Sequence, residues 1–154
     1  PGSRYTGDQS SCPRICTMVT LKPRDGAPFS LYNIHTDHVG KYARVLEVNQ
    51  LLARIAEDDK KLRIPVFVTG DFNDTPDSLC IKTMLEYDGG RFIDLSSDSG
   101  QTFHAYGKYI TEEGKIDYIF AENGTKCIQT EVIRDRRGSL YLSDHYPIMA
   151  EVEI

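Results

Sequence analysis

An apolar segment that ends in polar residues is the most informative part of this sequence: Arg63-Ile64-Pro65-Val66-Phe67-Val68-Thr69-Gly70-Asp71-Phe72-Asn73. Residues 63–69 lack the alternation of a half-buried strand, which is typical of a strand buried on both faces. Two-residue alternation then places Asp71 and Asn73 on the same side of the chain. Ligands of α/β sheets bind beyond the carboxyl ends of strands, so this position predicts a functional site. An Asp/Asn turn that leads into the next helix is the alternative interpretation.

Strand and helix patterns surround this segment. Alternation over 16–21 and 29–35 predicts a hairpin, with a turn at Asp25-Gly26. Apolar residues that recur every three to four positions over 41–58 indicate an amphipathic helix. A short helix over 79–87 and strands over 91–95, 115–121, 127–134 and 148–154 complete the pattern. The sequence therefore predicts an α/β domain in which helices cover a mixed sheet.

Composition limits the classes of function. The 154 residues carry a net charge of -5, which argues against a protein that coats nucleic acid through many Lys and Arg contacts. The longest apolar stretches are a few residues long, so no membrane span is expected. No signal-peptide pattern opens the chain, and we expect a cytoplasmic location. Residues 1–13 are expected to form a loop or a disordered end, and residues 14–154 to form the domain.

Two further clusters place acids and an imidazole next to strands. Asp117 lies within an apolar strand pattern, and a carboxylate there needs a partner because an unpaired buried charge is costly. That partner could be a structural Arg or Lys, or a catalytic imidazole. Ser143-Asp144-His145 precedes the last strand, where Pro147 marks an irregular entry. Neither cluster defines an activity by itself.

A fourth cluster ends the second strand pattern. His35 and His38, with Asp37 between them, suggest metal chemistry. The cluster comes close to the H-x-H-x-D-H pattern of metallo-β-lactamase-type dizinc hydrolases, but Asn33 stands where that pattern needs its first histidine. The chain has four histidines, which is few for two zinc sites. A dizinc hydrolase is therefore a minor alternative.

Taken in order, the clusters resemble the endonuclease/exonuclease/phosphatase superfamily, whose members share a DNase I-like fold. The similarity runs from about Arg14 to the end of the chain, and Thr102-Phe103-His104 is similar to the bacterial hydrolase branch in particular. The motifs are Asn33-Ile34-His35, Asp37-His38-Val39-Gly40, Ala43-Arg44, Gly70-Asp71-Phe72-Asn73, Ile116-Asp117-Tyr118-Ile119-Phe120 and Ser143-Asp144-His145-Tyr146-Pro147-Ile148.

The resemblance implies half of a four-layer α/β sandwich. That fold consists of two similar halves, and its first half supplies a phosphate-binding Asn and the principal metal-binding Glu. The first Glu of this chain is Glu47, inside the predicted helix. The chain is therefore expected to be the C-terminal half of such an enzyme.

The resemblance also implies a phosphoesterase that hydrolyses phosphodiesters or phosphomonoesters with an activated water and Mg²⁺ or Mn²⁺. Asp71 would orient or deprotonate the water, and Asn73 would hold phosphate or a metal-bound water. His145 would face the scissile phosphate with its ring charged by Asp117, and His35 would be a second catalytic imidazole. Asp144 would help to bind the metal.

Two more residues are candidates for substrate binding. His104 could line the substrate pocket, with core packing as the alternative. Arg137 could contact substrate phosphate, with a solvated hairpin tip as the alternative.

The expected partners follow from the expected half-domain. A phosphoester, either a small molecule or nucleic acid, is the expected ligand. The inner sheet face should be apolar and should pair with the missing N-terminal half or with another copy of the chain. Without that half, the fragment should bind Mg²⁺ poorly and show little activity. A non-catalytic interaction module of the same fold is the alternative from another class, and it predicts loss of site residues that are all present.

Overall fold

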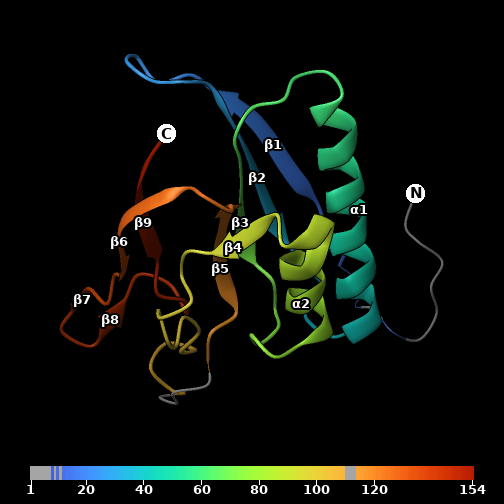
Figure 1. Ribbon diagram of the computed structural model, residues 1–154. Coiled ribbons are helices and arrows are strands. Elements are labelled where there is room, and N and C mark those ends of the chain that lie inside the picture. Colours follow the sequence, from blue (N-terminus) through green and yellow to red (C-terminus); the bar gives the residue numbers. More distant parts are fainter. Residues whose placement is uncertain (1–7, 9, 11, 110–113) are drawn as a thin grey trace.

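The computed structural model describes residues 8, 10, 12–109 and 114–154, in which the largest element is a five-stranded mixed sheet (Figure 1). The strand order is β1 (Cys16–Leu21), β2 (Phe29–His35), β3 (Val66–Asp71), β5 (Asp117–Glu122) and β4 (Phe92–Asp94). Strands β2 and β3 run parallel, and the other neighbours run antiparallel. The predicted α/β class with a mixed sheet is confirmed.

The remaining elements lie on the two sides of this sheet. Helix α1 (Lys41–Asp59) connects β2 to β3, and α2 (Leu79–Glu86) continues into the 3₁₀ turn η1 (Tyr87–Gly89). Strand β6 (Lys126–Val132) pairs with β9 (Ile148–Glu153), and β7 (Arg136–Arg137) pairs with β8 (Leu140–Tyr141). In Figure 1 both helices lie on one side of the large sheet and the β6–β9 ribbon lies on the other. No helix in the described part of the chain is long and apolar enough to cross a membrane.

The hydrophobic core lies between the sheet and the two helices. Because side chains alternate along a strand, one set from β2, β3 and β5 points toward the helices. This set packs with the apolar faces of α1 and α2, and both sets are buried. The sheet contributes Tyr32, Ile34, Val66, Val68, Tyr118 and Phe120, and the helices contribute Val48, Leu51, Leu52, Ile55, Ile81 and Met84. Residues at the alternate strand positions, among them His35, Asp71 and Asp117, therefore project from the opposite face.

Two strands that frame the candidate site begin and end later than predicted. Strand β3 runs through Asp71, which is its last residue. Strand β5 begins at Asp117 rather than at position 115. The reason for the later start is that the N–H groups of Ile116 and Asp117 donate to the side-chain oxygen of Thr102, at 3.1 and 3.2 Å. Asp117 is therefore the first residue of its strand, and Asp71 is the last residue of the strand beside it.

The N-terminus of α1 is capped by acids outside the helix. Its N-cap residue, Gly40, has no side chain to offer, and Asp37 Oδ1 accepts the N–H of Gly40 at 2.8 Å. Asp8 Oδ2 accepts the N–H of Tyr42 at 2.7 Å. These bonds satisfy amides that have no partner inside the helix. Asp8 precedes the predicted domain boundary at residue 14, and that boundary stays a prediction.

Candidate active site

Strand pairing brings three predicted site residues into one row across the sheet. His35 on β2 is the register partner of Asp71 on β3, and Asp71 is the register partner of Asp117 on β5. Register partners share a face of the sheet. His35 Nε2 lies 3.4 Å from Asp71 Oδ2. The fold thus places an imidazole and two carboxylates side by side on the face opposite to the helices.

The close approach of β2 to β3 next to Asp71 depends on a glycine. Gly70 has a φ of 149°, and a Cβ at this position would collide with the carbonyl oxygen of Ile34. A side chain here would push the two strands apart just where His35 and Asp71 meet. Gly70 therefore contributes to the site through the backbone.

His145 completes the cluster from the segment that precedes β9. Its Nδ1 lies 2.8 Å from Asp117 Oδ2, and its Nε2 lies 3.8 Å from Asp71 Oδ2. Phe103 forms an isolated β-bridge with His145, and their ring centroids are 5.0 Å apart. The predicted contact between Asp117 and His145 is present, and the imidazole lies between two carboxylates.

The surroundings of the cluster shift the pKa values of two of its members. The hydrogen bond that His145 donates to Asp117 raises the pKa of His145 above its ordinary value; partial burial opposes this shift, and the charges of Asp117, Asp71 and Asp144 add to it. Burial raises the pKa of Asp71 above its ordinary value. The charge of Asp117 also raises it, while the Asn73 N–H and the two histidines oppose the shift. The cluster therefore favours a protonated imidazole next to a carboxylate that takes up a proton more readily than usual.

Part of a divalent-metal site is present. Asp71, Asp117 and His145 offer ligand atoms that all lie within 4.8 Å of one another. Asp117 Oδ2 lies 2.8 Å from His145 Nδ1, whereas Asp71 Oδ2 lies farther from its two imidazole neighbours, at 3.4 and 3.8 Å. Carboxylate oxygens suit Mg²⁺ and Mn²⁺, which keep several waters and use few protein ligands. The donor set fits one side of such a site.

Two other predicted residues lie at the edge of the cluster. Asn73 follows β3 with a φ of 49°, so strand alternation does not decide the direction of its side chain. Its amide donates to the carbonyl oxygen of Thr36 at 3.0 Å, and its N–H donates to Asp71 Oδ1 at 2.8 Å. Asp144 accepts a hydrogen bond from Ser143 Oγ at 3.2 Å and is outside the group of three potential ligands. The roles of Asn73 and Asp144 stay predictions.

The two candidate substrate-binding residues lie in different environments. His104 is 1% exposed, and its ring packs against both Tyr141 and Tyr146, at centroid distances of 4.6 and 4.0 Å. Its Nδ1 accepts the N–H of Gly107 at 3.1 Å. Arg137 is exposed on β7. These environments favour the packing and hairpin alternatives, and a substrate contact from either residue stays a prediction.

Sequence reasoning missed the part that Thr102 plays next to the site. Thr102 is fully buried and bonds to the segments that carry Asp117 and His145. The motif Thr102-Phe103-His104 was visible in the sequence as a similarity to one branch of the family. Its contacts were not predictable, because they join segments that are distant along the chain.

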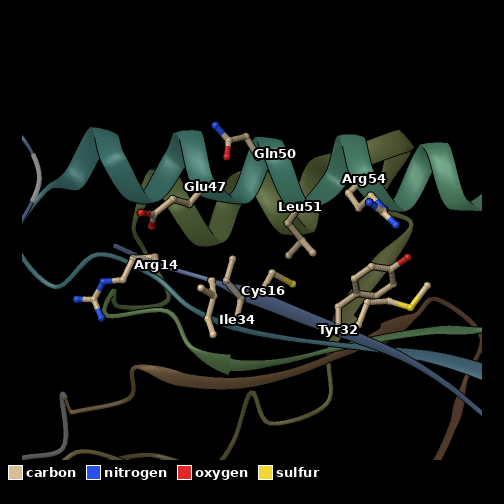
Figure 2. A pocket seen from close by; sticks show the side chains of 10 residues that line it. Arg14, Cys16, Tyr32, Ile34, Glu47, Gln50, Leu51 and Arg54 are labelled. Atoms are coloured by element: carbon tan, nitrogen blue, oxygen red, sulfur yellow. The ribbon is translucent and has the colours of Figure 1, made fainter. Parts of the chain in front are cut away.

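A separate hollow of about 380 Å³ lies between α1 and β1, on the helix side of the sheet. Figure 2 shows Glu47, Leu51 and Arg54 of α1 above Cys16 and Tyr32 of the sheet. The acid–imidazole cluster projects from the other face, so this hollow is not part of the candidate active site.

The fold and the cluster define an α/β domain with an acid–imidazole site on one face of a mixed sheet. The chain belongs to the Endonuclease/Exonuclease/phosphatase family, whose sequence model matches residues 4–145. Family membership makes the metallo-β-lactamase-type alternative wrong. In agreement, Asp37 bonds to backbone amides and His38 Nδ1 lies 2.7 Å from Arg14 Nη2, so neither converges with His35 on a metal position.

Solved structures show the same fold. A mannosyl-6-phosphatase from Bacteroides thetaiotaomicron is 26% identical, with a TM-score of 0.84 over 97% of this chain and 61% of that chain. An endonuclease/exonuclease/phosphatase from Bacteroides vulgatus is 30% identical, with a TM-score of 0.78 over 97% of this chain and 59% of that chain. The human nocturnin catalytic domain, at 17% identity and a TM-score of 0.69, covers 90% of this chain and 53% of its own, and shares the fold. No curated protein matches this chain.

The chain thus has a DNase I-like fold and spans about three fifths of the two Bacteroides structures. This agrees with the predicted fold class, in which one sheet and its covering helices form one side of a four-layer sandwich. The family consists of phosphatases and nucleases and is generally dependent on divalent metals.

Proposed function

We propose that this protein is a divalent-metal-dependent phosphoesterase that hydrolyses its substrate with an activated water. One observation carries the proposal: the imidazole of His145 lies between two carboxylates. Its Nδ1 is 2.8 Å from Asp117 Oδ2, and its Nε2 is 3.8 Å from Asp71 Oδ2. Pairs of titratable groups with different environments are typical of sites that run acid and base chemistry together.

His145 would act as a cation or proton donor that faces the scissile phosphate. An ionised carboxylate only accepts hydrogen bonds, so the proton of His145 Nδ1 points to Asp117. The second ring nitrogen, Nε2, remains available for a phosphate oxygen. The pKa of His145 is raised mainly by the bond to Asp117, which keeps Nε2 protonated at higher pH than usual. A protonated Nε2 would neutralise charge that develops on the phosphoryl group.

Asp71 would act on the water. Its Oδ1 is held by the N–H of Asn73, and its Oδ2 lies toward His35 and His145. In the proposed step a water oxygen bonds to phosphorus, a water proton passes to Asp71, and the bond between phosphorus and the leaving oxygen breaks. The leaving oxygen keeps the electron pair of that bond and then takes a proton from His145 Nε2 or from water. His35, which is largely exposed next to Asp71, would contact the phosphate or the leaving group.

Asp144 would contribute a carboxylate to the metal site, and Asn73 would hold phosphate or a metal-bound water. When bound, Mg²⁺ or Mn²⁺ supplies Lewis-acid polarisation of the phosphoryl oxygen and stabilises the departing oxyanion. Because a full oxygen ligand set needs more groups than these, we expect further ligands from the rest of the domain.

The sheet face opposite to α1 and α2, here called the open sheet face, is expected to contact the missing half of the domain. At the end of this face away from His35, β1 presents Val19 at 40% and Leu21 at 43% exposure, next to Leu31 and Phe29 of β2. At the other end the face is polar and carries the cluster. An apolar patch that borders a site matches a sheet-on-sheet contact with an N-terminal half, or else with a second copy of the chain.

Small phosphorylated compounds are the first substrates to test. The similar protein from Bacteroides thetaiotaomicron is a mannosyl-6-phosphatase, and an acidic chain is poorly suited to long nucleic acid. The test is release of phosphate from a panel of sugar phosphates, and cleavage of a diester, by the intact protein with Mg²⁺ or Mn²⁺. The wild type should hydrolyse at least one of them, and Asp117→Asn should hydrolyse it much more slowly. If the folded wild type hydrolysed none of them, a non-catalytic interaction module would be favoured instead.

A further inference from the structure

A buried threonine connects the two segments that supply the acid and the imidazole of the site. Thr102 has no exposed surface and lies in an irregular segment between β4 and β5. Its Oγ1 accepts the N–H groups of Ile116 and Asp117, at 3.1 and 3.2 Å. Its carbonyl oxygen accepts the N–H of Tyr146 at 2.7 Å. One residue therefore bonds to the start of β5 and to the residue that follows His145.

The neighbours of Thr102 bind the same two segments. The N–H groups of Thr102 and Phe103 both donate to the carbonyl oxygen of Gly114, at 3.0 and 2.9 Å. The N–H of His104 donates to the carbonyl oxygen of Asp144 at 2.9 Å, on the other side. Residues 102–104 thus lie between the segment that leads into β5 and the segment that carries His145, as a short extra strand would.

The hydroxyl of Thr102 uses its full capacity for hydrogen bonds. Besides accepting two N–H groups, it donates to the carbonyl oxygen of Gly114 at 3.3 Å. A hydroxyl has one donor and two acceptor positions, so no position is left for a substrate or a water. This points to a role in geometry and not in chemistry.

We infer that Thr102 is a positioning residue. It holds the start of β5 and the segment that carries His145 at the distance that the hydrogen bond between Asp117 Oδ2 and His145 Nδ1 requires. Loss of its hydroxyl would leave two partly buried N–H groups without that acceptor, and the start of β5 would have to move to satisfy them. A displacement of about 1 Å can cost about a hundredfold in rate. The catalytic consequence rests on the function proposed above, whereas the geometric consequence does not.

The test compares Thr102→Val and Thr102→Ser in the intact protein. Thr83→Val is the matched control, because among the described residues the hydroxyl of Thr83 bonds to Leu79 alone, one turn earlier in α2. The first readout is the downfield proton NMR signal of the hydrogen-bonded His145 Nδ1–H, assigned by its loss in Asp117→Asn. The second is kcat and KM on a phosphoester that the wild type hydrolyses, and circular dichroism monitors the fold.

Thr102→Val should lose or shift the downfield signal and lower kcat about tenfold to a hundredfold, with KM changed by less than about twofold. Thr102→Ser and Thr83→Val should keep both properties near the wild type. A folded Thr102→Val protein with an unchanged signal and kcat would overturn the inference.

If Thr102→Val does not fold, Thr102→Ser still decides. It retains the hydroxyl, so loss of the signal in a folded Thr102→Ser protein would contradict the inference. If the wild type shows no phosphoesterase activity, the proposed function fails, and the NMR signal alone tests the positioning role.

Discussion

Asp71 and Asp117 are register partners on the antiparallel strands β3 and β5, and of these two acids Asp117 is the one whose carboxylate accepts a hydrogen bond from His145 Nδ1, at 2.8 Å. The two acids are thus adjacent but electrostatically different. Asp117 stabilises the imidazolium, whereas burial and the charge of Asp117 raise the pKa of Asp71. This difference suits one acid to hold a cation and the other to accept a proton.

Replacement of Asp117 by Asn should lower kcat/KM by about two to four orders of magnitude. The pKa of His145 is raised in the folded protein, chiefly by the bond to Asp117, so the protonated form should be lost at lower pH in the variant. The alkaline limb of the pH–rate profile should therefore move to lower pH. The pKa of Asp71 should also fall when a neighbouring charge is removed, so the acid limb should move to lower pH as well.

The measurement is kcat/KM against pH for the wild type and Asp117→Asn, with Asp98→Asn as the control at an exposed acid. An unchanged profile in Asp117→Asn would show that Asp117 does not set the charge of His145.

Replacement of Asp37 by Ala should destabilise the protein by about 3 kcal/mol at neutral pH, because α1 loses a charged cap. Although burial opposes ionisation, bonds from Gly40, Ser10 and Val39 hold the pKa of Asp37 below its ordinary value. The stabilisation is therefore present above the ordinary carboxyl pKa and is lost as the pH falls through the lower pKa of the folded state.

Urea unfolding of wild type and Asp37→Ala at several pH values measures this contribution. The difference in the free energy of unfolding between wild type and Asp37→Ala should reach its largest value at pH 7 and should become smaller in acid. Asp98→Ala, at an exposed position, should show no such difference. An Asp37→Ala protein as stable as the wild type at pH 7 would show that Asp37 does not stabilise the N-terminus of α1.

Replacement of Phe72 by Ala should cost about 3 to 5 kcal/mol, because it leaves a cavity below the site. Phe72, which stands between Asp71 and Asn73 in the sequence, is fully buried. Its ring packs edge-on against Tyr118 and Phe120, at centroid distances of 5.5 and 5.2 Å. Thermal or urea unfolding measures the loss, and Phe72→Leu should lose much less. Equal stability of Phe72→Ala and the wild type would exclude this ring as a support for the site.

The 154-residue chain alone should bind Mg²⁺ more weakly than the intact protein, because Asp71 and its neighbours form only part of an oxygen ligand set. Isothermal titration of both forms with MgCl₂ measures the difference. Equal affinity would show that this chain already carries the full site. Light scattering checks the open sheet face, since a strictly monomeric fragment would argue against an apolar contact surface.

Most elements of the fold were predictable because they depend on local patterns. The period of apolar residues over 41–58 indicated α1, and the unbroken apolar run at Val66–Val68 indicated a strand buried on both faces; these three residues are 2, 6 and 0% exposed. The ends of β3 and β5 were less predictable. Their last and first residues depend on which partner satisfies each backbone N–H, and for β5 that partner is the distant side chain of Thr102.

The sequence by itself determined the residue types of the site, their order and the family that they resemble, because motifs are local in the chain. The resemblance already implied that Asp117 pairs with His145, and only the tertiary structure decided the geometry, which puts Asp117 Oδ2 2.8 Å from His145 Nδ1 and leaves Asp71 Oδ2 at 3.4 and 3.8 Å from two imidazoles. That geometry follows from the register of β3 against β5 and from the bonds of Thr102, both of which are contacts between distant segments. The tertiary structure also decided that His104 is buried, although its motif was equally visible in the sequence. Tyr141 and Tyr146, which lie near the end of the chain, pack against its ring.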